Sequence, residues 1–294
     1  METVRNRAEV LTEALPYIQK FFNKTVVIKY GGNAMTNEVL KNAVMKDMVL
    51  LSIIGIKVVL VHGGGPEINT MLDRVGKETY FIDGLRYTDQ DTAEIVGMVL
   101  AGKVNKSLVS LIHNNGGKAM GLCGVDGGMI EAKKKESKQD LGYVGDITHV
   151  DTTPITVALE NGFIPVIATI GVDENGQIYN INADTAAAAI AGALKAVKLI
   201  SMTDVRGILA ELQDEDSLIS RISVSDVPKL IETGVISGGM IPKIESCVYG
   251  LEMGVEEAII IDGRIEHSIL IELFSNKGIG TLFYPAKEET VTYK

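Results

Sequence analysis

The sequence predicts an α/β protein built on a largely parallel β-sheet with helices on both faces. Three observations support this fold class. Short continuous runs of apolar, often β-branched residues alternate with segments of helical periodicity along most of the chain. Glycine-rich turns follow the first two apolar runs, at Gly31-Gly32 and at Gly63–Gly65. The 294 residues include 31 glycines but only 7 prolines, so the glycines indicate tight turns rather than a disordered tract.

Composition argues against several classes of function. A net charge of −10 disfavours binding to nucleic acid, which needs a basic surface. The cysteines, Cys123 and Cys247, are too few for a disulfide framework and favour a reducing compartment. Arg5, Arg7 and Glu9 interrupt any signal peptide, and no apolar run approaches the ~20 residues of a membrane helix. We therefore expect a cytoplasmic protein whose partners include no nucleic acid and no membrane.

The chain begins with a predicted amphipathic helix, from residue 3 to about 22, which Pro16 should kink. This helix can pack on its own domain, or it can be an arm that contacts another subunit, since it precedes the first core strand. The apolar residues that recur at helical spacing are Val10, Leu11, Ala14, Leu15, Ile18, Phe21 and Phe22.

Strands and helices alternate from residue 25 onward. Gly55 is placed to end the first long helix, and Pro66 suits the first turn of the next one. The pattern fits two lobes on one continuous sheet, with a seam near residue 175, better than two separate domains. The predicted strands are 25–30, 57–62, 118–123, small strands within 130–150, 164–168, 198–203, 258–262 and 280–284. The predicted helices are 37–54, one after Pro66, 89–115, 152–161, 185–194, 225–233 and 242–253, with hairpins at 77–88 and after residue 203.

Signatures of several familiar enzyme classes are absent from the sequence. It contains no G-x-x-x-x-G-K-[ST], no G-x-G-x-x-G after a strand, no H-R-D or D-F-G, and no G-x-S-x-G. The four histidines are scattered, and no Cys/His spacing suits zinc. The sequence therefore disfavours Walker-type, dinucleotide-binding, protein-kinase, serine-hydrolase and zinc sites.

Charged and polar residues at strand ends and glycine turns remain as candidates. Ligands of open α/β sheets bind beyond the carboxyl ends of strands, and glycine turns that lead into helices present N–H groups to anions. The pattern predicts a phosphorylated or carboxylated small molecule as ligand. The candidates are Lys29, Gly31, Gly32, Gly63–Gly65, Arg86, Asn180, Asp184, Thr203, Asp204 and Lys243.

Each charged candidate also has a purely structural explanation. Lys29 could be a surface charge, and Arg86 could only form a salt bridge, although its planar fork suits a carboxylate. Asp184 could be the N-cap of the alanine-rich helix, a role compatible with a functional one. Lys243 lies in the first turn of its helix, where its charge opposes the helix dipole, and this unfavourable placement suggests a function.

Five strings resemble the N-acetylglutamate kinases, a branch of the amino acid kinase superfamily. They are I-K-Y-G-G-N-A-M at 28–35, V-H-G-G-G-P at 61–66, G-L-R-Y-T at 84–88, Y-N-I-N-A-D at 179–184 and G-G-M-I-P-K at 238–243. The similarity extends from residue 25 to about 284. It implies a three-layer αβα sandwich with an amino-acid-binding lobe at 25–175, an ATP-binding lobe at 176–294 and an oligomerisation arm at 1–24.

The resemblance implies a reaction and roles for the catalytic residues. ATP would phosphorylate the γ-carboxylate of N-acetyl-L-glutamate, giving N-acetyl-L-glutamyl 5-phosphate and ADP in arginine biosynthesis. Lys29 and Lys243 would neutralise charge on the transferring phosphoryl group, and Asp184 would hold both lysines. The acceptor is ionised at neutral pH, with a reference pKa near ~4.3, so no general base is required. Mg²⁺ would be held mainly through the nucleotide phosphates, and no residue is expected to ligate a metal.

The resemblance also assigns binding residues. Gly64 and Gly65 would donate backbone hydrogen bonds near the substrate, Arg86 would bind its α-carboxylate, and Asn180 would bind its acetamido group. The residues expected to border the nucleotide are Gly31, Gly32, Thr203, Asp204, Gly207, Ile208, Leu209, Val235, Ile236 and Ser237.

Arginine-inhibited members of the family are similar to this chain in two further features. They carry an extra kinked N-terminal helix that links dimers into a hexamer, a trimer of dimers, and they have a segment like residues 263–274 followed by 278–281. The resemblance implies arginine as an effector, bound by Tyr17, His267, Glu272 and Gly278. A helix that only oligomerises remains the alternative.

Two rival hypotheses concern function. A kinase of the same superfamily could act on a carrier-bound glutamate or aminoadipate, but the net charge of −10 disfavours an acidic carrier. A catalytically silent arginine-binding regulator is the second rival, and the joint presence of Lys29, Asp184 and Lys243 argues against it.

Overall fold

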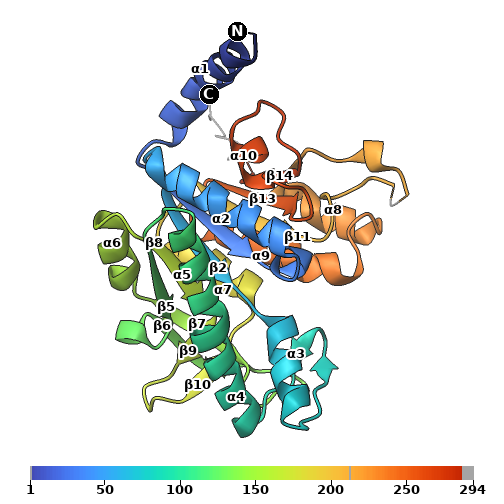
Figure 1. The fold of residues 1–294 in the computed structure, drawn as a ribbon. Coiled ribbons are helices and arrows are strands. Elements are labelled where there is room, and N and C mark those ends of the chain that lie inside the picture. Colours follow the sequence, from blue (N-terminus) through green and yellow to red (C-terminus); the bar gives the residue numbers. More distant parts are fainter. Residues whose placement is uncertain (1, 212, 287–294) are drawn as a thin grey trace, which may run out of the picture.

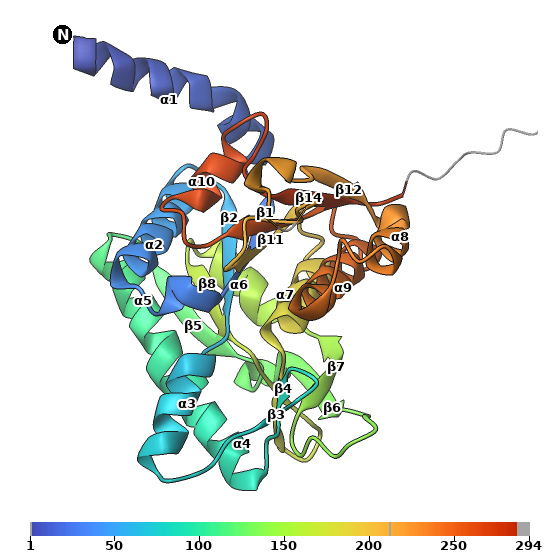
Figure 2. The same ribbon diagram turned by 90° about the vertical axis from the view of Figure 1, so that its right-hand side faces the viewer.

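The computed structural model describes residues 2–211 and 213–286, except for the side chains of residues 2–8 and 33. Residues 1, 212 and 287–294, which the predicted arm and C-terminal lobe include, lie outside the described residues. A central sheet lies between two layers of helices, a smaller sheet lies at one end, and helix α1 projects from the other end (Figures 1 and 2). This arrangement confirms the predicted three-layer αβα sandwich.

The central sheet has eight strands in the order β12-β14-β13-β11-β1-β2-β8-β5. A four-stranded sheet, β10-β9-β6-β7, and the hairpin β3-β4 accompany it. The strands of the central sheet are β1 (Thr25–Tyr30), β2 (Lys57–His62), β5 (Ala119–Cys123), β8 (Ile164–Ala168), β11 (Lys198–Thr203), β12 (Arg221–Ser223), β13 (Glu257–Asp262) and β14 (Thr281–Tyr284). The others are β3 (Phe81–Ile82), β4 (Leu85–Arg86), β6 (Ile130–Lys134), β7 (Gly145–Val150), β9 (Ile170–Val172) and β10 (Ile178–Asn180).

The helices fill the layers on both sides of the sheet. The helices are α1 (Glu2–Phe21), α2 (Glu38–Ile53), α3 (Gly65–Arg74), α4 (Gln90–Gly97), a π-helical segment (Met98–Val104), α5 (Asn105–Asn114), α6 (Thr153–Glu160), α7 (Ala183–Ala193), α8 (Val227–Glu232), α9 (Ile241–Glu252) and α10 (Ser268–Leu273). Short 3₁₀ turns lie at Gly32–Met35, Asp126–Gly128, Glu215–Ser217, Val224–Asp226 and Gly238–Met240.

Strand β1 lies at the middle of the central sheet and pairs in parallel with β2 and β11. Its side chains alternate between the two faces, as a strand requires. Ile28 belongs to the core cluster that also contains residues of α2 and α5, whereas Val27 belongs to the cluster that contains residues of α7 and α9. By the same alternation Lys29 lies on the α7 and α9 side. Among the described strand pairs of this sheet, only β13 with β14 is antiparallel.

Several predicted elements differ from those observed. The helix predicted over 89–115 is interrupted by the π-helical segment. The hairpin predicted after residue 203 is reduced to one antiparallel bridge between Leu209 and Leu218, because strand β12 pairs in parallel with β14 instead. Strand β9 and helix α10 were not predicted, and both are short elements whose apolar residues do not establish a period.

Helix α1 continues through Pro16 and changes direction before it reaches the body, as Figure 2 shows. Phe21 at its C-terminal end is 3% exposed and belongs to the core. Val10, Leu11 and Leu15 are instead 63%, 71% and 50% exposed. The helix therefore packs on its own domain only at its C-terminal end.

By length and hydropathy, the stretch Gln90–Asn114 could span a membrane. This corrects the expectation that no apolar run approaches that length. In the fold, Val99, Leu100, Val104 and Leu108 of this stretch are buried in the core. A core helix passes the same test of length and composition, so the stretch by itself is weak evidence for a membrane span.

Candidate active site

A carboxylate held between two ammonium groups forms the centre of the site. Asp184 Oδ1 lies 3.0 Å from Lys29 Nζ, and Asp184 Oδ2 lies 3.4 Å from Lys243 Nζ. Ser201 Oγ on β11 donates a further hydrogen bond of 3.2 Å to Asp184 Oδ1. The structure thus brings together three predicted residues from β1, α7 and α9, which are separated by up to 214 positions in sequence (243 − 29).

Local structure explains how these side chains meet. Helix α7 starts after Asn182, whose side chain accepts hydrogen bonds from the backbone N–H groups of Asp184 and Thr185. Asn182 is therefore the N-cap, and the suggestion that Asp184 caps this helix was wrong, because Asp184 already lies one residue inside it. Lys243 lies in the first turn of α9, as predicted, where the Asp184 carboxylate offsets the unfavourable helix dipole.

The electrostatics of this cluster favour the charged forms. Burial by itself raises the pKa of the Asp184 carboxyl, but the ammonium groups of Lys29 and Lys243 outweigh burial and hold that pKa below its usual value. Asp184 is therefore a carboxylate at neutral pH. Two ammonium groups fixed by one carboxylate leave a net positive charge, which suits the stabilisation of a phosphoryl group.

The first glycine turn lies beside this cluster. A Cβ at Gly31 would come within 2.9 Å of Lys29 Nζ. Gly32 has φ +69°, which favours glycine, and a Cβ there would lie 2.5 Å from Asp204 Oδ1. The turn is therefore enclosed between Lys29 and Asp204, and only a residue without a side chain fits at Gly32.

The second glycine turn borders a cavity of about 180 Å³ that Arg86 and Asn180 also line. Gly64 and Gly65 lead into α3, and a Cβ at Gly65 would meet no neighbour within 4 Å. The cavity thus has backbone N–H groups of a helix N-terminus, a guanidinium and an amide on its walls. Its apolar lining comes from Ile68, Phe81, Leu85, Leu100, Val144, Ile181 and Ala183.

Arg86 is 6% exposed, and its guanidinium is held by two polar side chains. It donates hydrogen bonds to Thr79 Oγ1 (2.5 Å) and Asn69 Oδ1 (2.6 Å), and the guanidinium lies over the Phe81 ring at 4.8 Å. Burial lowers the pKa of Arg86 below its usual value. An arginine stays protonated at any physiological pH, so this position keeps a fixed positive charge for an anionic ligand. Thr88 Oγ1 links Arg86 to Asn180, since it donates to the Arg86 carbonyl and accepts from Asn180 Nδ2.

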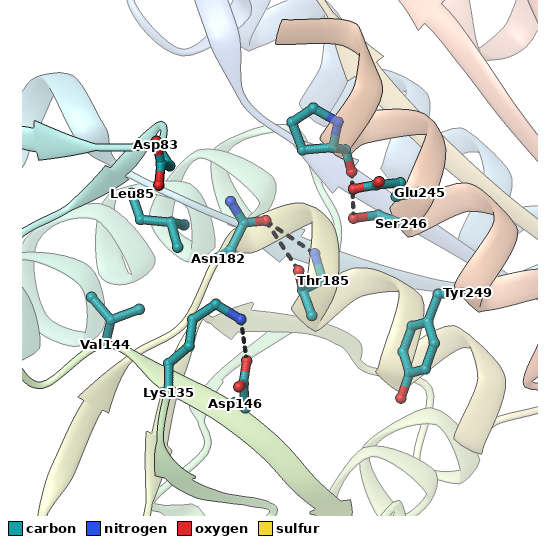
Figure 3. Close-up of a pocket in the computed structure, with 12 residues that line it drawn as sticks. Asp83, Leu85, Lys135, Val144, Asp146, Asn182, Thr185, Glu245, Ser246 and Tyr249 are labelled. Atoms are coloured by element: carbon teal, nitrogen blue, oxygen red, sulfur yellow. Dashed lines mark hydrogen bonds and ion pairs between the residues drawn. The ribbon is translucent and has the colours of Figure 1, made fainter. Parts of the chain in front are cut away.

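A second cavity of about 370 Å³ adjoins the first (Figure 3). Leu85, Val144 and Asn182 line both cavities. In Figure 3 the β3-β4 hairpin lies on one side of it and helices α7 and α9 lie on the other, with the Lys135–Asp146 ion pair (2.7 Å) at its edge. The two cavities together form a cleft between the small sheet and the helices that carry Asp184 and Lys243.

The residues predicted to border a nucleotide occupy two short connections. Thr203 ends β11, and Gly207 adopts φ +152° where a Cβ would lie 2.6 Å from Thr281 Oγ1. Thr281 Oγ1 also accepts a hydrogen bond from the Ile208 backbone, and Leu209 follows in the same connection. The Ile208 and Ile236 side chains lie in the core, so these two residues can present only backbone atoms. The other connection, Val235–Ser237, leads directly to the turn before Lys243.

The predicted effector residues lie mostly together, away from this cleft. Tyr17, Glu272 and Gly278 line a cavity of about 620 Å³ between α1, α10 and the loop that follows. Tyr17 donates a hydrogen bond to Asn276 Oδ1 (2.7 Å), and Glu272 Oε2 accepts one from the Ile279 backbone (2.8 Å). The fourth predicted residue, His267, is bonded through Nδ1 to Asp47 Oδ1 of α2 at 2.5 Å.

The residues that hold the site residues in place were not predicted from the sequence. Ser201 contacts Asp184, and Asn69 and Thr79 contact Arg86. A signal existed for Ser201, because it is a polar residue within an otherwise apolar strand that ends at the site. No sequence pattern connects Asn69 or Thr79 with Arg86, since their pairing depends on how α3 packs against the hairpin.

Comparisons with known proteins agree with this geometry. The model of the amino acid kinase family matches residues 24–262. An acetylglutamate kinase of Brachyspira hyodysenteriae is 56% identical over 286 residues, covering 97% of this chain and 99% of the relative. One of Clostridioides difficile is 56% identical over 282 residues, covering 96% and 98%. The crystal structure of N-acetylglutamate synthase from Neisseria gonorrhoeae complexed with coenzyme A and N-acetyl-glutamate has a TM-score of 0.81 and 27% identity. That match covers 94% of this chain and 63% of the synthase. The chain therefore belongs to the amino acid kinase family, as a phosphotransferase whose close relatives within that family are acetylglutamate kinases.

Proposed function

We propose that this protein transfers the γ-phosphoryl group of ATP to the γ-carboxylate of N-acetyl-L-glutamate. The products would be N-acetyl-L-glutamyl 5-phosphate and ADP, a step of arginine biosynthesis in the cytoplasm. The observation that carries the proposal is the Lys29–Asp184–Lys243 cluster beside two glycine turns. Because the acceptor carboxylate is already ionised, positioning and charge neutralisation can supply the catalysis without a general base.

The cavity between the second glycine turn and Arg86 supports the substrate assignment. Its volume of about 180 Å³ suits a small molecule rather than a carrier protein. We propose that Arg86 binds the α-carboxylate, that Asn180 binds the acetamido group, and that the Gly64 and Gly65 amides bind the acceptor carboxylate. The apolar walls suit the methylene and acetyl carbons. The similar synthase of Neisseria gonorrhoeae is described in complex with N-acetyl-glutamate, which supports the same ligand class.

The nucleotide would lie on the other side of the cluster, bordered by Gly31, Gly32 and the connection that starts at Thr203-Asp204. Mg²⁺ prefers to keep several waters and commonly reaches enzymes on substrate phosphates. Both oxygens of Asp184 are engaged by lysines, so this carboxylate would fix the ammonium groups rather than the ion. We therefore propose that Mg²⁺ arrives on the ATP phosphates and supplies further charge neutralisation.

A phosphoryl-transfer assay tests the proposal. The purified protein is incubated with ATP, Mg²⁺ and a panel that includes N-acetyl-L-glutamate, L-glutamate, L-aspartate and N-acetyl-L-aspartate. We expect turnover to be highest with N-acetyl-L-glutamate. Faster turnover of a free amino acid or of N-acetyl-L-aspartate would contradict the assignment.

We also propose that arginine inhibits the enzyme at the cavity between α1 and α10, in a hexamer formed as a trimer of dimers. Glu272 and Tyr17 line this cavity, and a carboxylate accepts the guanidinium fork through two parallel hydrogen bonds. The synthase of Neisseria gonorrhoeae is also described in complex with L-arginine, at 26% identity and a TM-score of 0.78. Arginine titration of Glu272→Gln against the parent enzyme tests this site, and unchanged inhibition would remove Glu272 from it.

A further inference from the structure

The π-helical segment Met98–Val104 lies against the second glycine turn. A Cβ at Gly64 would come within 2.7 Å of Leu100 Cδ2 and 3.2 Å of Val104 Cγ2. π-Helical segments are rare and are often found at functional sites, because the extra residue changes the direction of the side chains that follow. The first residue after this segment is Asn105, which is buried against strands β2, β5 and β8.

Asn105 is held in a single orientation by its partners. Its Nδ2 donates to the Val166 carbonyl (2.8 Å) and the Leu122 carbonyl (3.3 Å), and lies 3.1 Å from His62 Nε2. Its Oδ1 accepts from Lys106 Nζ at 3.1 Å. Because the carbonyls require donors and the ammonium requires an acceptor, the amide cannot be reversed. Asn105 therefore presents an N–H group to the imidazole.

This contact determines the tautomer of His62. Nε2 faces a donor and must accept, so the proton resides on Nδ1, which donates to the Gly63 carbonyl at 2.8 Å. His62 is fully buried, and burial lowers its pKa to about 4. The imidazole is thus neutral at physiological pH, and a single tautomer connects Asn105 to the glycine turn.

The Gly63 carbonyl and the Gly64 N–H belong to the same planar peptide unit, in which they point in opposite directions. A donor that holds the carbonyl toward His62 therefore turns the Gly64 N–H toward the opposite side. Gly64 lines the cavity that Arg86 and Asn180 share. The orientation of this N–H thus depends on a hydrogen bond from His62, a residue that none of the proposed ligand contacts includes.

We infer that Asn105 and His62 are positioning residues that aim the Gly64 N–H at the acceptor carboxylate. Asn105 fixes the imidazole tautomer, and the imidazole fixes the peptide plane. The π-helical segment places Asn105 at this point and closes the far side of Gly64 with Leu100 and Val104. This inference rests on the proposed function for the identity of the ligand, but the orientation of the peptide can be tested without it.

Two substitutions of His62 separate its hydrogen bond to the Gly63 carbonyl from its contact with Asn105. In His62→Asn the side-chain amide occupies the place of Nδ1 and can still donate to the Gly63 carbonyl. In His62→Gln the amide reaches the place of Nε2, which keeps the contact with Asn105 but leaves the Gly63 carbonyl without its donor. Both remove the buried imidazole, so their losses of folding stability should be similar. Asn105→Leu removes the contact that sets the tautomer. Ser110→Ala, at an exposed position of the same helix, serves as the control outside these contacts.

The measurements are kcat and KM for N-acetyl-L-glutamate and hydrogen exchange of peptides that contain residues 63–65. We expect His62→Gln and Asn105→Leu to lower kcat/KM roughly tenfold to a hundredfold, as small misplacements of catalytic groups do. Their glycine turn should exchange faster. His62→Asn should stay within about threefold of the parent in kcat/KM, with exchange close to the parent, and Ser110→Ala should match the parent in both.

Equal effects of His62→Asn and His62→Gln on kcat/KM and exchange would overturn the inference. If His62 had only a structural role, the two substitutions would change both measurements to the same extent. Unchanged kinetics and exchange in His62→Gln would overturn it as well. If the parent enzyme does not turn over N-acetyl-L-glutamate, the proposed function fails, while the exchange comparison still decides the positioning role.

Discussion

At the scale of single residues, the site depends on charges whose environment decides their state. Lys29 is nearly buried, and its ammonium is tolerated there because Asp184 lies 3.0 Å away. The same carboxylate also holds Lys243. A change at Asp184 therefore alters two cations at once, whereas a change at either lysine alters one.

Asp184→Asn tests this asymmetry. The amide keeps the size of the side chain but removes the charge that holds both lysines, so we expect kcat to fall by roughly 10²-fold or more. Ser201→Ala is the matched control, because it removes only one hydrogen bond to the same carboxylate and should lower kcat a few-fold at most. Steady-state kinetics with N-acetyl-L-glutamate and ATP decide between them. Similar losses in both variants would contradict the role given to Asp184.

The two lysines and Arg86 should differ in which kinetic constant they affect. Lys29→Ala and Lys243→Ala should chiefly lower kcat, roughly 10²-fold, because their charges act where charge develops in the transition state. Arg86→Ala should mainly raise the KM for the amino acid, since in the proposed function Arg86 binds a carboxylate that does not react. Small and equal effects of all three substitutions would count against these roles.

The lowered pKa of His62 predicts how the free energy of unfolding depends on pH. An unfolded histidine has a pKa near ~6.5, whereas burial lowers the pKa of His62 to about 4. Between these values the unfolded chain binds a proton that the folded chain does not, so stability falls as pH decreases. The loss approaches about 1.4 kcal/mol per pH unit from this group.

Urea unfolding of the parent and of His62→Gln at pH 7.5 and pH 5 measures this effect. The parent should lose more free energy of unfolding than the variant over this interval. Asp47 has its pKa raised to about 6 by burial and acts in the opposite direction, but it is present in both proteins and cancels in the comparison. Equal losses in the two proteins would contradict the prediction, because they would mean that the pKa of His62 is the same in the folded and the unfolded protein.

At the scale of elements, α1 has two parts with different surroundings. Its C-terminal end is anchored, since Phe21 lies in the core and Phe22 packs against Gly55. Its middle exposes Val10, Leu11 and Leu15. Val10 and Leu11, together with residues of α2 and α10, border an apolar cavity of about 760 Å³. Apolar surface of this kind favours a further contact, which fits the proposed hexamer.

Truncation should therefore stop before the anchored part. Deletion of residues 1–15 removes the exposed apolar residues and keeps Phe21, whereas deletion of residues 1–22 would also open the core. We expect the shorter deletion to convert a hexamer to a dimer that remains active and is insensitive to arginine. Sedimentation velocity and arginine titration measure both properties, with Leu11→Asp in the full chain as a point-substitution counterpart. A truncated protein that stays hexameric and inhibited would contradict the role of the arm.

At the scale of the whole molecule, a continuous sheet connects the two proposed binding regions. Strand β1 carries Lys29 and lies between β2, which leads to the cavity at Gly64, and β11, which leads to Thr203-Asp204. A ligand in the cavity at Gly64 and a ligand at Thr203-Asp204 would both lie beside β1, but they would contact different residues. The boundary at residue 175 between two lobes stays a prediction.

Ligand-dependent thermal stability tests this division. A ligand that binds only the folded protein stabilises it by about 2.7 kcal/mol at a hundredfold excess over its Kd. Both N-acetyl-L-glutamate and ATP should therefore raise the Tm of the parent. Arg86→Ala should lose the shift caused by N-acetyl-L-glutamate and keep the shift caused by ATP. Loss of both shifts would show that the two regions are not independent.

Most strands of the central sheet and the glycine turns after β1 and β2 could be predicted from the sequence, whereas β12 could not. Strands β1, β2, β8 and β11 were predicted with their observed bounds, because strands buried on both faces are continuous apolar runs that local composition defines. Lys29, Arg86, Asp184 and Lys243 could be selected in the same way, since each lies in a local motif at a strand or helix end.

Which of these groups meet, and which residues hold them, follows from how the elements pack in three dimensions. Packing brings Ser201 to Asp184, Asn69 and Thr79 to Arg86, and Asn105 to His62, pairs that lie between 7 and 43 positions apart in the sequence. Asp184 was one possible N-cap of α7, but the structure places Asn182 at that position, with its side chain bonded to the backbone N–H groups of Asp184 and Thr185. Local sequence encodes propensity and period, whereas contacts between distant residues depend on how the elements pack, and a single sequence does not record that packing.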